Sequence, residues 1–221
     1  MLDSSKPRTA PMEAKNLKAD RHTIPGSRRA SLCLLAIFFA FPSISRAQSV
    51  PVFVISPEES SIKFHVKASV ALDGTFDKWN ATFTVTSTDP ATGVLDVKIQ
   101  ADSVNTGSGM KDGKLKSKDF FDVKQDPLIT FHSNKIVQTG PDTFDVQGTF
   151  TIRGVSRPET LNLTLFGKGT GSGEVKGMMA FDRKEYGMNS GIPFIRIADR
   201  VEVTVDLKAK RVSGPPMVFQ Q

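Results

Sequence analysis

The amino-acid sequence predicts an all-β fold, an antiparallel barrel or sandwich of about eight short strands. Apolar and polar residues alternate in run after run, which is the pattern of strands with one buried face. Short turn signals such as Asp73-Gly74 and Arg153-Gly154 separate these runs. The residues from Gln48 onward are numerous enough for one domain with a sizeable core.

The alternation can be followed along the chain. The first stripe places Ile62, Phe64 and Val66 on one face of a strand, with Lys63, His65 and Lys67 on the other. The pattern recurs at Phe83/Val85, Leu95/Val97/Ile99, Ile129/Phe131, Phe144/Val146, Phe150/Ile152, Leu161/Leu163/Leu165, Val175/Met179/Phe181 and Val201/Val203/Val205/Leu207. Each of these runs predicts a half-buried strand.

Two segments interrupt the alternation. Residues 106–122 are rich in Gly, Lys and Asp, and we expect a long connection there with a short helix near residues 110–117. Residues 183–198 form a second irregular segment, which contains Tyr186, Pro193 and Phe194. Long loops in a compact domain are frequently functional, so we expect both segments at a rim of the fold.

The first 47 residues predict an export signal that is removed. A basic stretch ending in Arg28-Arg29 precedes an apolar run at residues 32–41, and Ser45-Arg46-Ala47 offers small residues for cleavage. The apolar run is shorter than the roughly 20 residues of a membrane-spanning helix. We expect cleavage near Ala47 and a periplasmic or secreted protein, exported by the general secretory route with a twin-arginine route as the alternative. The mature chain then comprises a domain at residues 48–210 and a flexible tail at residues 211–221.

The charge of the chain is concentrated in this leader. Eight of the 29 Lys and Arg residues and three of the 23 Asp and Glu residues precede Gln48, which leaves 21 basic against 20 acidic residues. Nonspecific binding to a polyanion requires a surplus of cations. We therefore expect no nucleic-acid partner.

Residues for catalysis are missing from the sequence after the leader. His65 and His132 are its only histidines, and the single Cys33 lies inside the apolar run of the leader. Neither a zinc set nor a disulfide can be assembled from these residues. Ser108 and Ser172 do not stand in the Gly-x-Ser-x-Gly frame of a nucleophile elbow. We therefore predict a protein that is not an enzyme and has no metal site and no cofactor.

The aromatic residues favour an apolar ligand. Of the 16 phenylalanines, 13 follow the leader, alongside one Trp and one Tyr. A lining of Phe suits an apolar chain better than a sugar. An eight-stranded barrel either fills its interior with side chains or holds one slender ligand, and the sequence leaves both open. An outer-membrane barrel is disfavoured, because Trp and Tyr are too few for two aromatic girdles and Pro215-Pro216 interrupt the last segment. We therefore expect no membrane insertion.

Four ordered blocks of the sequence resemble the YceI-like family. They are Lys-Ser-Lys-Asp-Phe-Phe-Asp-Val at 116–123 with Pro-Leu-Ile-Thr-Phe at 127–131, Gly-Thr-Phe-Thr-Ile-Arg-Gly-Val-Ser-Arg-Pro at 148–158, Phe-Asp-Arg at 181–183 with Tyr186-Gly187, and Val-Glu-Val-Thr-Val-Asp-Leu-Lys-Ala at 201–209. The resemblance implies a single secreted, lipocalin-like barrel that binds a polyisoprenoid or another long apolar chain without transforming it. It also favours a homodimer. Lys114 departs from the family, which often carries histidine there.

The predicted ligand-binding residues combine inward-facing stripe positions, the Phe pair beside the long connection and two cations at the rim. They are Phe64, Val66, Phe83, Phe120, Phe121, Phe131, Ile152, Met179, Phe181, Lys114 and Arg183. A cluster of lysines that includes Lys114 could meet a diphosphate or carboxylate head group, or it could belong to a solvated loop. Arg183 could instead form a local ion pair with Asp182 or Glu185. A second hypothesis for the function is a secreted stress or interaction protein with a filled barrel and no lipid cargo.

Overall fold

The computed structural model describes residues 49–69, 72–191 and 196–220, and the predictions for the leader and for Pro193 and Phe194 lie outside these residues. The strands are β1 (Val52–Ile55), β2 (Ser61–Ala68), β3 (Leu72–Phe76), β4 (Trp79–Thr84), β5 (Val94–Gln100), β6 (Val104–Asn105), β7 (Leu128–Gln138), β8 (Thr143–Ile152), β9 (Val155–Phe166), β10 (Ser172–Asp182) and β11 (Ile197–Ser213). The α-helix is α1 (Gly109–Lys116), and four short 3-10 helices occur at Pro57–Glu59, Pro90–Thr92, Ala101–Ser103 and Arg183–Tyr186.

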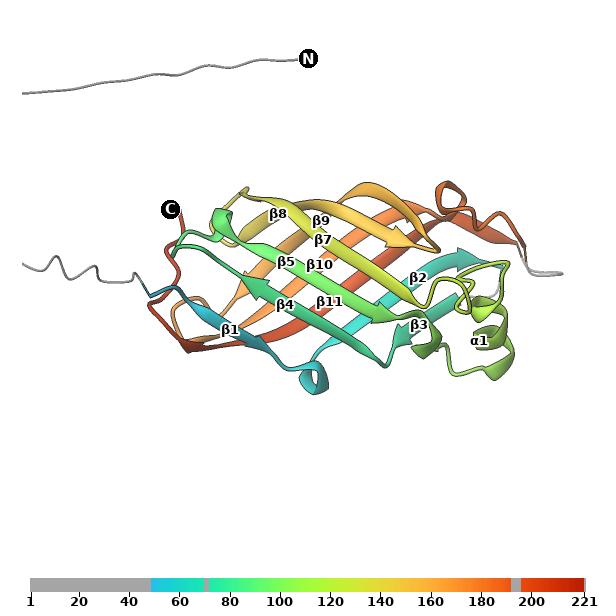
Figure 1. Cartoon of the computed structure of the whole chain (residues 1–221), viewed down its shortest axis with the longest axis horizontal. Helices are drawn as coiled ribbons and strands as arrows, with labels where there is room; N and C mark the ends of the chain where they lie inside the picture. Colours follow the sequence, from blue (N-terminus) through green and yellow to red (C-terminus); the bar gives the residue numbers. More distant parts are fainter. Residues whose placement is uncertain (1–48, 70–71, 192–195, 221) are drawn as a thin grey trace, which may run out of the picture. The chain divides into compact units, whose positions relative to one another are not determined.

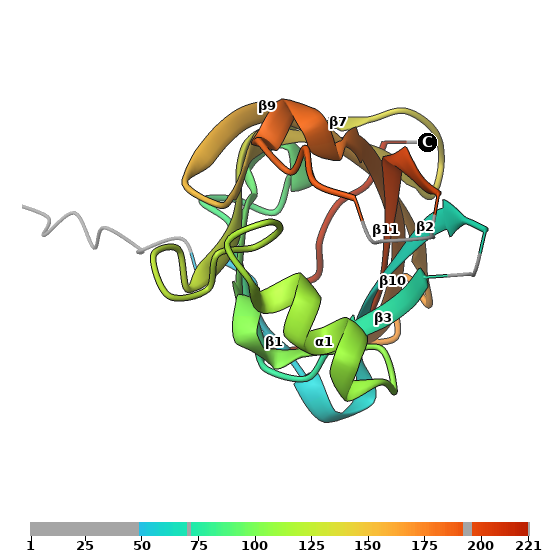
Figure 2. The same ribbon diagram turned by 90° about the vertical axis from the view of Figure 1, so that its right-hand side faces the viewer.

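The strands form one antiparallel sheet that curls into a barrel (Figures 1 and 2). Its hydrogen-bonded order is β4-β5-β7-β8-β9-β10-β11-β2-β3-β6, with β1 added to β11. Only two residues separate β3, which pairs with β2, from β4, which pairs with β5. The two strands therefore act as one bent strand that passes from one neighbour to the other. Counted in this way, the wall has eight long strands, and the predicted all-β barrel is confirmed.

Side chains close the seam between β1 and β4. Among the described residues, β1 forms a ladder only with β11, and β4 only with β5. The rings of Phe53 on β1 and Phe83 on β4 lie 5.9 Å apart between centroids, in a tilted arrangement. Aromatic contacts of this kind bury a large apolar area, so they hold β1 and β4 together where no ladder joins these two strands.

The predicted alternation matches the burial of the side chains. On β2, Ile62, Phe64 and Val66 are buried while Lys63 and Lys67 are exposed. The buried positions face the interior because successive side chains of a strand point to opposite sides of the sheet. The inward-facing side chains of each strand thus form the apolar interior, and the outward-facing side chains contact water.

The connection that contains α1 lies across part of one end of the barrel (Figure 2). Helix α1 covers residues 109–116, one residue from the predicted range. Leu115 on the helix and the following Phe120 and Phe121 are 3–7% exposed, and the Phe121 ring lies 6.0 Å from that of Phe76. Apolar side chains from the connection therefore pack into this end of the barrel.

A belt of side chains fills the middle of the barrel. Val97, Phe131, Met179 and Val205 make up this central belt, and they are 5–9% exposed. Gly148 provides room for it, since a Cβ at this position would lie 2.8 Å from Cζ of Phe131. The same Cβ would lie 2.5 Å from the carbonyl oxygen of His132, so a larger residue at position 148 would displace both the Phe131 ring and the backbone of β7. The interior is therefore packed at mid-height, and any space for a ligand must lie toward the two ends.

Substitution at the central belt tests this packing. We expect Phe131→Glu to lower the free energy of unfolding by more than ~3 kcal/mol, because it places an unpaired carboxylate in an apolar core. The control Lys67→Glu lies on the exposed face of β2 and should stay within about ±0.5 kcal/mol. Chemical denaturation of both variants measures the difference. Equal stability of the two variants would show that the interior at Phe131 is hydrated.

Candidate ligand-binding pocket

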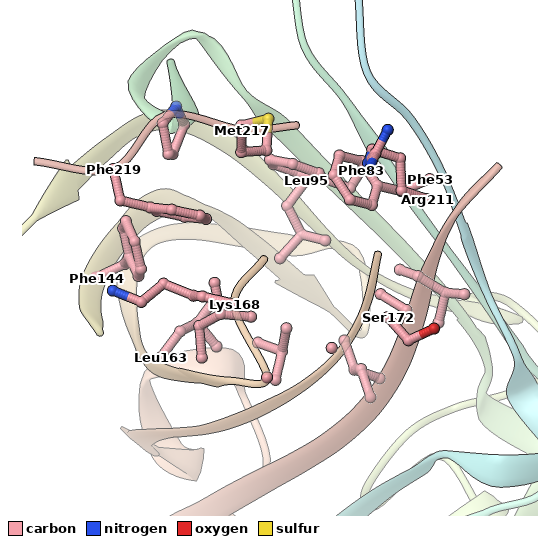
Figure 3. A pocket seen from close by; sticks show the side chains of 18 of the residues that line it. Phe53, Phe83, Leu95, Phe144, Leu163, Lys168, Ser172, Arg211, Met217 and Phe219 are labelled. Carbon is pink, nitrogen blue, oxygen red and sulfur yellow. The ribbon is translucent and has the colours of Figure 1, made fainter. Parts of the chain in front are cut away.

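A cavity with a volume of about 180 Å³ lies at the barrel end opposite α1 (Figure 3). We call it the large pocket. Its wall consists mainly of apolar side chains from β1, β4, β5, β7, β8, β9, β10 and β11: Phe53, Ile55, Phe83, Leu95, Ile136, Phe144, Val146, Leu163, Leu165, Val175 and Leu207. Several of these, including Phe53, Phe83, Leu163 and Leu165, are only partly buried. The large pocket is therefore an apolar surface that solvent reaches.

A second cavity of about 60 Å³ lies beneath the α1 connection. We call it the small cavity. Most of its wall is fully buried, including Phe64, Ile129 and Phe150. The central belt contributes to neither cavity. The barrel is thus hollow at one end, nearly filled at the other and packed between them.

The predicted site residues divide among these three regions. Phe83 lines the large pocket, whereas Phe64, Val66, Phe120, Phe121, Ile152, Phe181 and Arg183 line the small cavity. Phe131 and Met179 belong to the central belt, and Lys114 lies on the α1 connection. The structure therefore gathers most of the predicted residues at the α1 end, away from the larger space. Ligand contact at these positions stays a prediction.

Lys114 is held by an acidic neighbour. Its Nζ lies 2.5 Å from Oδ2 of Asp119 and 5.9 Å from the centroid of the Phe120 ring. The hydrogen bond from Lys114 lowers the pKa of Asp119. A head group that used Lys114 would have to compete with this carboxylate, which favours the solvated-loop interpretation of Lys114.

Arg183 is 6% exposed, and its donors bind both the loop that follows β10 and the first residues of β11. Nη1 donates to the carbonyl oxygens of Met188 and Ser190, and Nε donates to the carbonyl oxygen of Ala198 at 3.2 Å. Nη2 donates to Oδ1 of Asp199 at 3.1 Å, so the ion-pair partner is neither Asp182 nor Glu185. Lys184 contributes the largest effect that lowers the pKa of Asp199, and Arg183 adds to it. These bonds assign Arg183 to holding the loop in place.

Tyr186 anchors the same loop and was not among the predicted site residues. It is 0% exposed, and its ring lies 5.1 Å from that of Phe181 and 5.6 Å from that of Phe150. Its hydroxyl donates to Oε1 of Glu159 at 2.8 Å. Burial, and then this hydrogen bond, raise the pKa of Tyr186, so the phenol stays protonated. In the sequence, Tyr186 stood out as the single Tyr of an irregular segment and as part of a block that resembles the YceI-like family.

The C-terminal segment, residues 214–220, covers the large pocket. Pro216, Met217 and Phe219 line it, and the Phe219 ring lies 6.1 Å from that of Phe144 (Figure 3). The Val218 amide donates to the carbonyl oxygen of Thr88 at 2.8 Å. The side chain of Gln138 exchanges two hydrogen bonds of 2.9 Å with the backbone of Gln220. The segment therefore contributes apolar side chains to the pocket while few hydrogen bonds hold it.

The domain boundary that we expected at residue 210 does not coincide with the end of the last strand. β11 continues to Ser213, because residues up to Lys210 pair with β10 and residues up to Ser213 pair with β1. The residues of β1 that make this possible carried no long alternating run. The added pairing brings Arg211 to the edge of the large pocket.

Neither a metal centre nor a transmembrane helix is found among the residues described. No three or more His, Cys, Asp or Glu side chains in these residues lie close enough together to bind a metal ion. Within the same residues, no helix has the length and apolar character needed to cross a membrane.

Comparison with known proteins identifies the class to which this barrel belongs. Residues 53–209 match the family described as the YceI-like domain. A UPF0312 protein of Pseudomonas savastanoi pv. phaseolicola is 31% identical over 145 residues, which is 64% of this chain and 75% of that protein. The protein YceI of Salmonella arizonae is 36% identical over 98 residues, 44% of this chain and 51% of that protein. The chain belongs to the YceI-like family.

Solved structures have the same fold. BcnA of Burkholderia cenocepacia has a TM-score of 0.64 at 24% identity, with 70% of this chain and 99% of that chain covered. A polyisoprenoid-binding domain from Saccharophagus degradans has a TM-score of 0.59 at 17% identity, with 73% of this chain and 99% of that chain covered. These similarities place the chain among barrels of one architecture.

Removal of the C-terminal segment tests its role at the large pocket. A chain that ends at Gly214 should bind the neutral fluorescent probe N-phenyl-1-naphthylamine about five- to tenfold more tightly, because the probe no longer displaces Met217 and Phe219. Its stability should fall by about 1–3 kcal/mol, since a few hydrogen bonds and one aromatic contact are lost. Fluorescence titration and thermal melting measure both effects. Weaker probe binding by the truncated chain would show that the segment contacts the bound probe and does not compete with it for the pocket.

Proposed function

We propose that this protein is an exported binding protein that takes up one apolar chain, of isoprenoid or fatty type, in the large pocket without transforming it. The observation that carries the proposal is the partly exposed apolar wall of about 180 Å³ at one end of the barrel. A pocket of this kind binds an apolar group by removing both surfaces from water. The polyisoprenoid-binding domain of Saccharophagus degradans, which has the same fold, supports the choice of ligand class.

The volume of the large pocket limits how much of a chain it holds. A cavity of ~150 Å³ accommodates benzene, so 180 Å³ accommodates roughly six to eight carbons, or one isoprene unit with part of a second. At ~0.8 kcal/mol per methylene, this portion contributes about 5–6 kcal/mol, which is near the low end of association costs of about 4–15 kcal/mol. Tight binding of a longer chain therefore requires more contact area. The space taken by residues 214–220 supplies it once these residues move.

Binding without chemistry is consistent with the surroundings of this pocket. Its described wall contains Lys168, Ser172 and Arg211 as polar side chains, with no histidine, aspartate or glutamate among them. General acid–base catalysis needs a group whose pKa lies near the working pH. The lining offers no such group, so we assign the protein a carrier or sequestering role.

Extraction of the purified protein tests the proposed function. We expect organic extraction and native mass spectrometry to find an isoprenoid or fatty chain bound to the wild type. Leu163→Trp should fold normally but lose both this ligand and N-phenyl-1-naphthylamine, because the indole occupies the large pocket. The matched control is Thr164→Trp, the next residue of β9 on the opposite face, which should bind as the wild type does. An empty wild-type protein that also takes up no probe would favour the filled-barrel interaction protein.

Export is a further part of the proposal, supported by the basic and apolar pattern of residues 1–47. We expect the mature protein to begin at Gln48, after removal of the leader at Ala47. N-terminal sequencing of protein recovered from the exported fraction measures this. A mature chain that retains residues 32–41 would indicate an anchored protein instead.

A further inference from the structure

Two cations, Lys168 and Arg211, lie at the large pocket, and their surroundings differ. Lys168 is neutralised, since its Nζ lies 2.6 Å from Oδ1 of Asp142 and donates to the carbonyl oxygen of Pro141. Among the described residues, no carboxylate lies within ion-pair distance of the Arg211 guanidinium, which donates from Nη1 to the carbonyl oxygen of Gly214.

The strand parity directs Arg211 toward the pocket. Leu207, Ala209 and Arg211 are alternate residues of β11, and all three line the large pocket. Side chains two residues apart in a strand share a face, so Arg211 continues the inner face of the barrel to its rim. The partner of Arg211 on β1 is Phe53, which lines the same pocket. A half-buried cation thus takes a place in the wall where apolar side chains otherwise stand (Figure 3).

The guanidinium also has space beside it. A Cβ built at Gly171 would lie 4.0 Å from Nη2 of Arg211, and it would meet no closer atom. Gly171 has a φ of +80° in the turn between β9 and β10, a conformation that favours glycine. The turn therefore leaves Nη2 with room for another group at the mouth.

We infer that Arg211 binds the oxyanion head group of a single-chain amphiphile, a carboxylate or a phosphate monoester, whose apolar end occupies the large pocket. This inference rests on the proposed function and specifies its ligand. A guanidinium presents donors in a fork that matches two oxygens of such a group, and an anion compensates a cation that is partly removed from water. The head group would replace the carbonyl oxygen of Gly214, where the C-terminal segment begins. Binding of the anion and release of residues 214–220 would then be coupled.

Ligands that differ only in the head group provide the test. We expect the wild type to bind decanoate and decyl phosphate about five- to tenfold more tightly than methyl decanoate at pH 7.5 and low salt, which is the size of a partly screened charge contact. Arg211→Met should reduce the affinity for the two anions to that for the ester, while the ester binds as before. Calorimetric titration with all three ligands measures these affinities. Comparison of decanoate with decyl phosphate shows which oxyanion the site prefers.

The control is Lys210→Met, which removes a charge from the adjacent residue on the outer face of β11. It should keep the full preference for anions. Arg211→Lys keeps the charge without the fork and should lose part of the preference, so it answers the question if Arg211→Met fails to fold. Equal binding of ester and anions by the wild type would overturn the role of Arg211 while leaving the proposed function intact. Absence of binding by all three ligands and by the neutral probe would reject the proposed function itself.

Discussion

The curled wall of eight strands, joined at its seam by side chains, is the constraint on which the rest of this structure depends. Because side chains alternate across each strand, half of the wall's residues must share an interior of fixed width. The sizes of the inward residues then decide where that interior is filled. At mid-height, the Phe131 ring packs against Gly148, and the side chains of the central belt fill the interior. Toward the end opposite α1, the inward residues leave about 180 Å³ between them, so a site arises from a local deficit of side-chain volume.

The two ends of the barrel differ in how they are closed. At the α1 end, Leu115, Phe120 and Phe121 are buried, and Arg183 binds three carbonyl oxygens and a carboxylate. Opening this end would expose these apolar side chains to water and break the hydrogen bonds and the ion pair of Arg183, which is costly. At the other end, the cover is a short segment with few hydrogen bonds, of the kind that opens at low free energy. The ligand would therefore enter where opening disturbs the least buried structure.

The sequence was sufficient for the fold because the alternation is local. The stripe at Ile62, Phe64 and Val66 identified the inner face of β2, and the helix of the long connection was placed within one residue. The site was harder to predict, since it depends on contacts between distant segments. Leu163 and Leu165 stood in a predicted stripe, but nothing in their spacing showed that the opposing side chains fail to meet. Residues 214–220 carry no alternation, and their place at the pocket follows from the pairing of β1 with β11, which is not encoded by either strand alone.

Lys114 and Arg211 show that the sequence around a cation does not indicate which groups neutralise it in the fold. Lysines near Phe120-Phe121 attracted attention because they cluster in sequence, yet Lys114 has its carboxylate partner five residues away. Arg211 stands next to Lys210 near the end of a strand and shows no distinctive pattern, although the structure gives it an inward position where no described carboxylate forms an ion pair with it. A charge acts on a ligand according to what already neutralises it and how far water screens it. The carboxylate of Asp119 already neutralises Lys114, whereas no described carboxylate neutralises Arg211.

The C-terminal segment both covers the large pocket and forms part of its wall. While residues 214–220 are in place, Met217 and Phe219 shield apolar side chains that would otherwise face water, so the empty protein gains stability from them. A ligand must replace these contacts as well as form its own, and its affinity reflects only the difference between the two. Short chains gain little from the exchange because they fill no more than the space already empty. On the proposed function, longer chains would recover the area that the segment gives up, so the segment would lower the affinity overall and would favour longer chains over shorter ones.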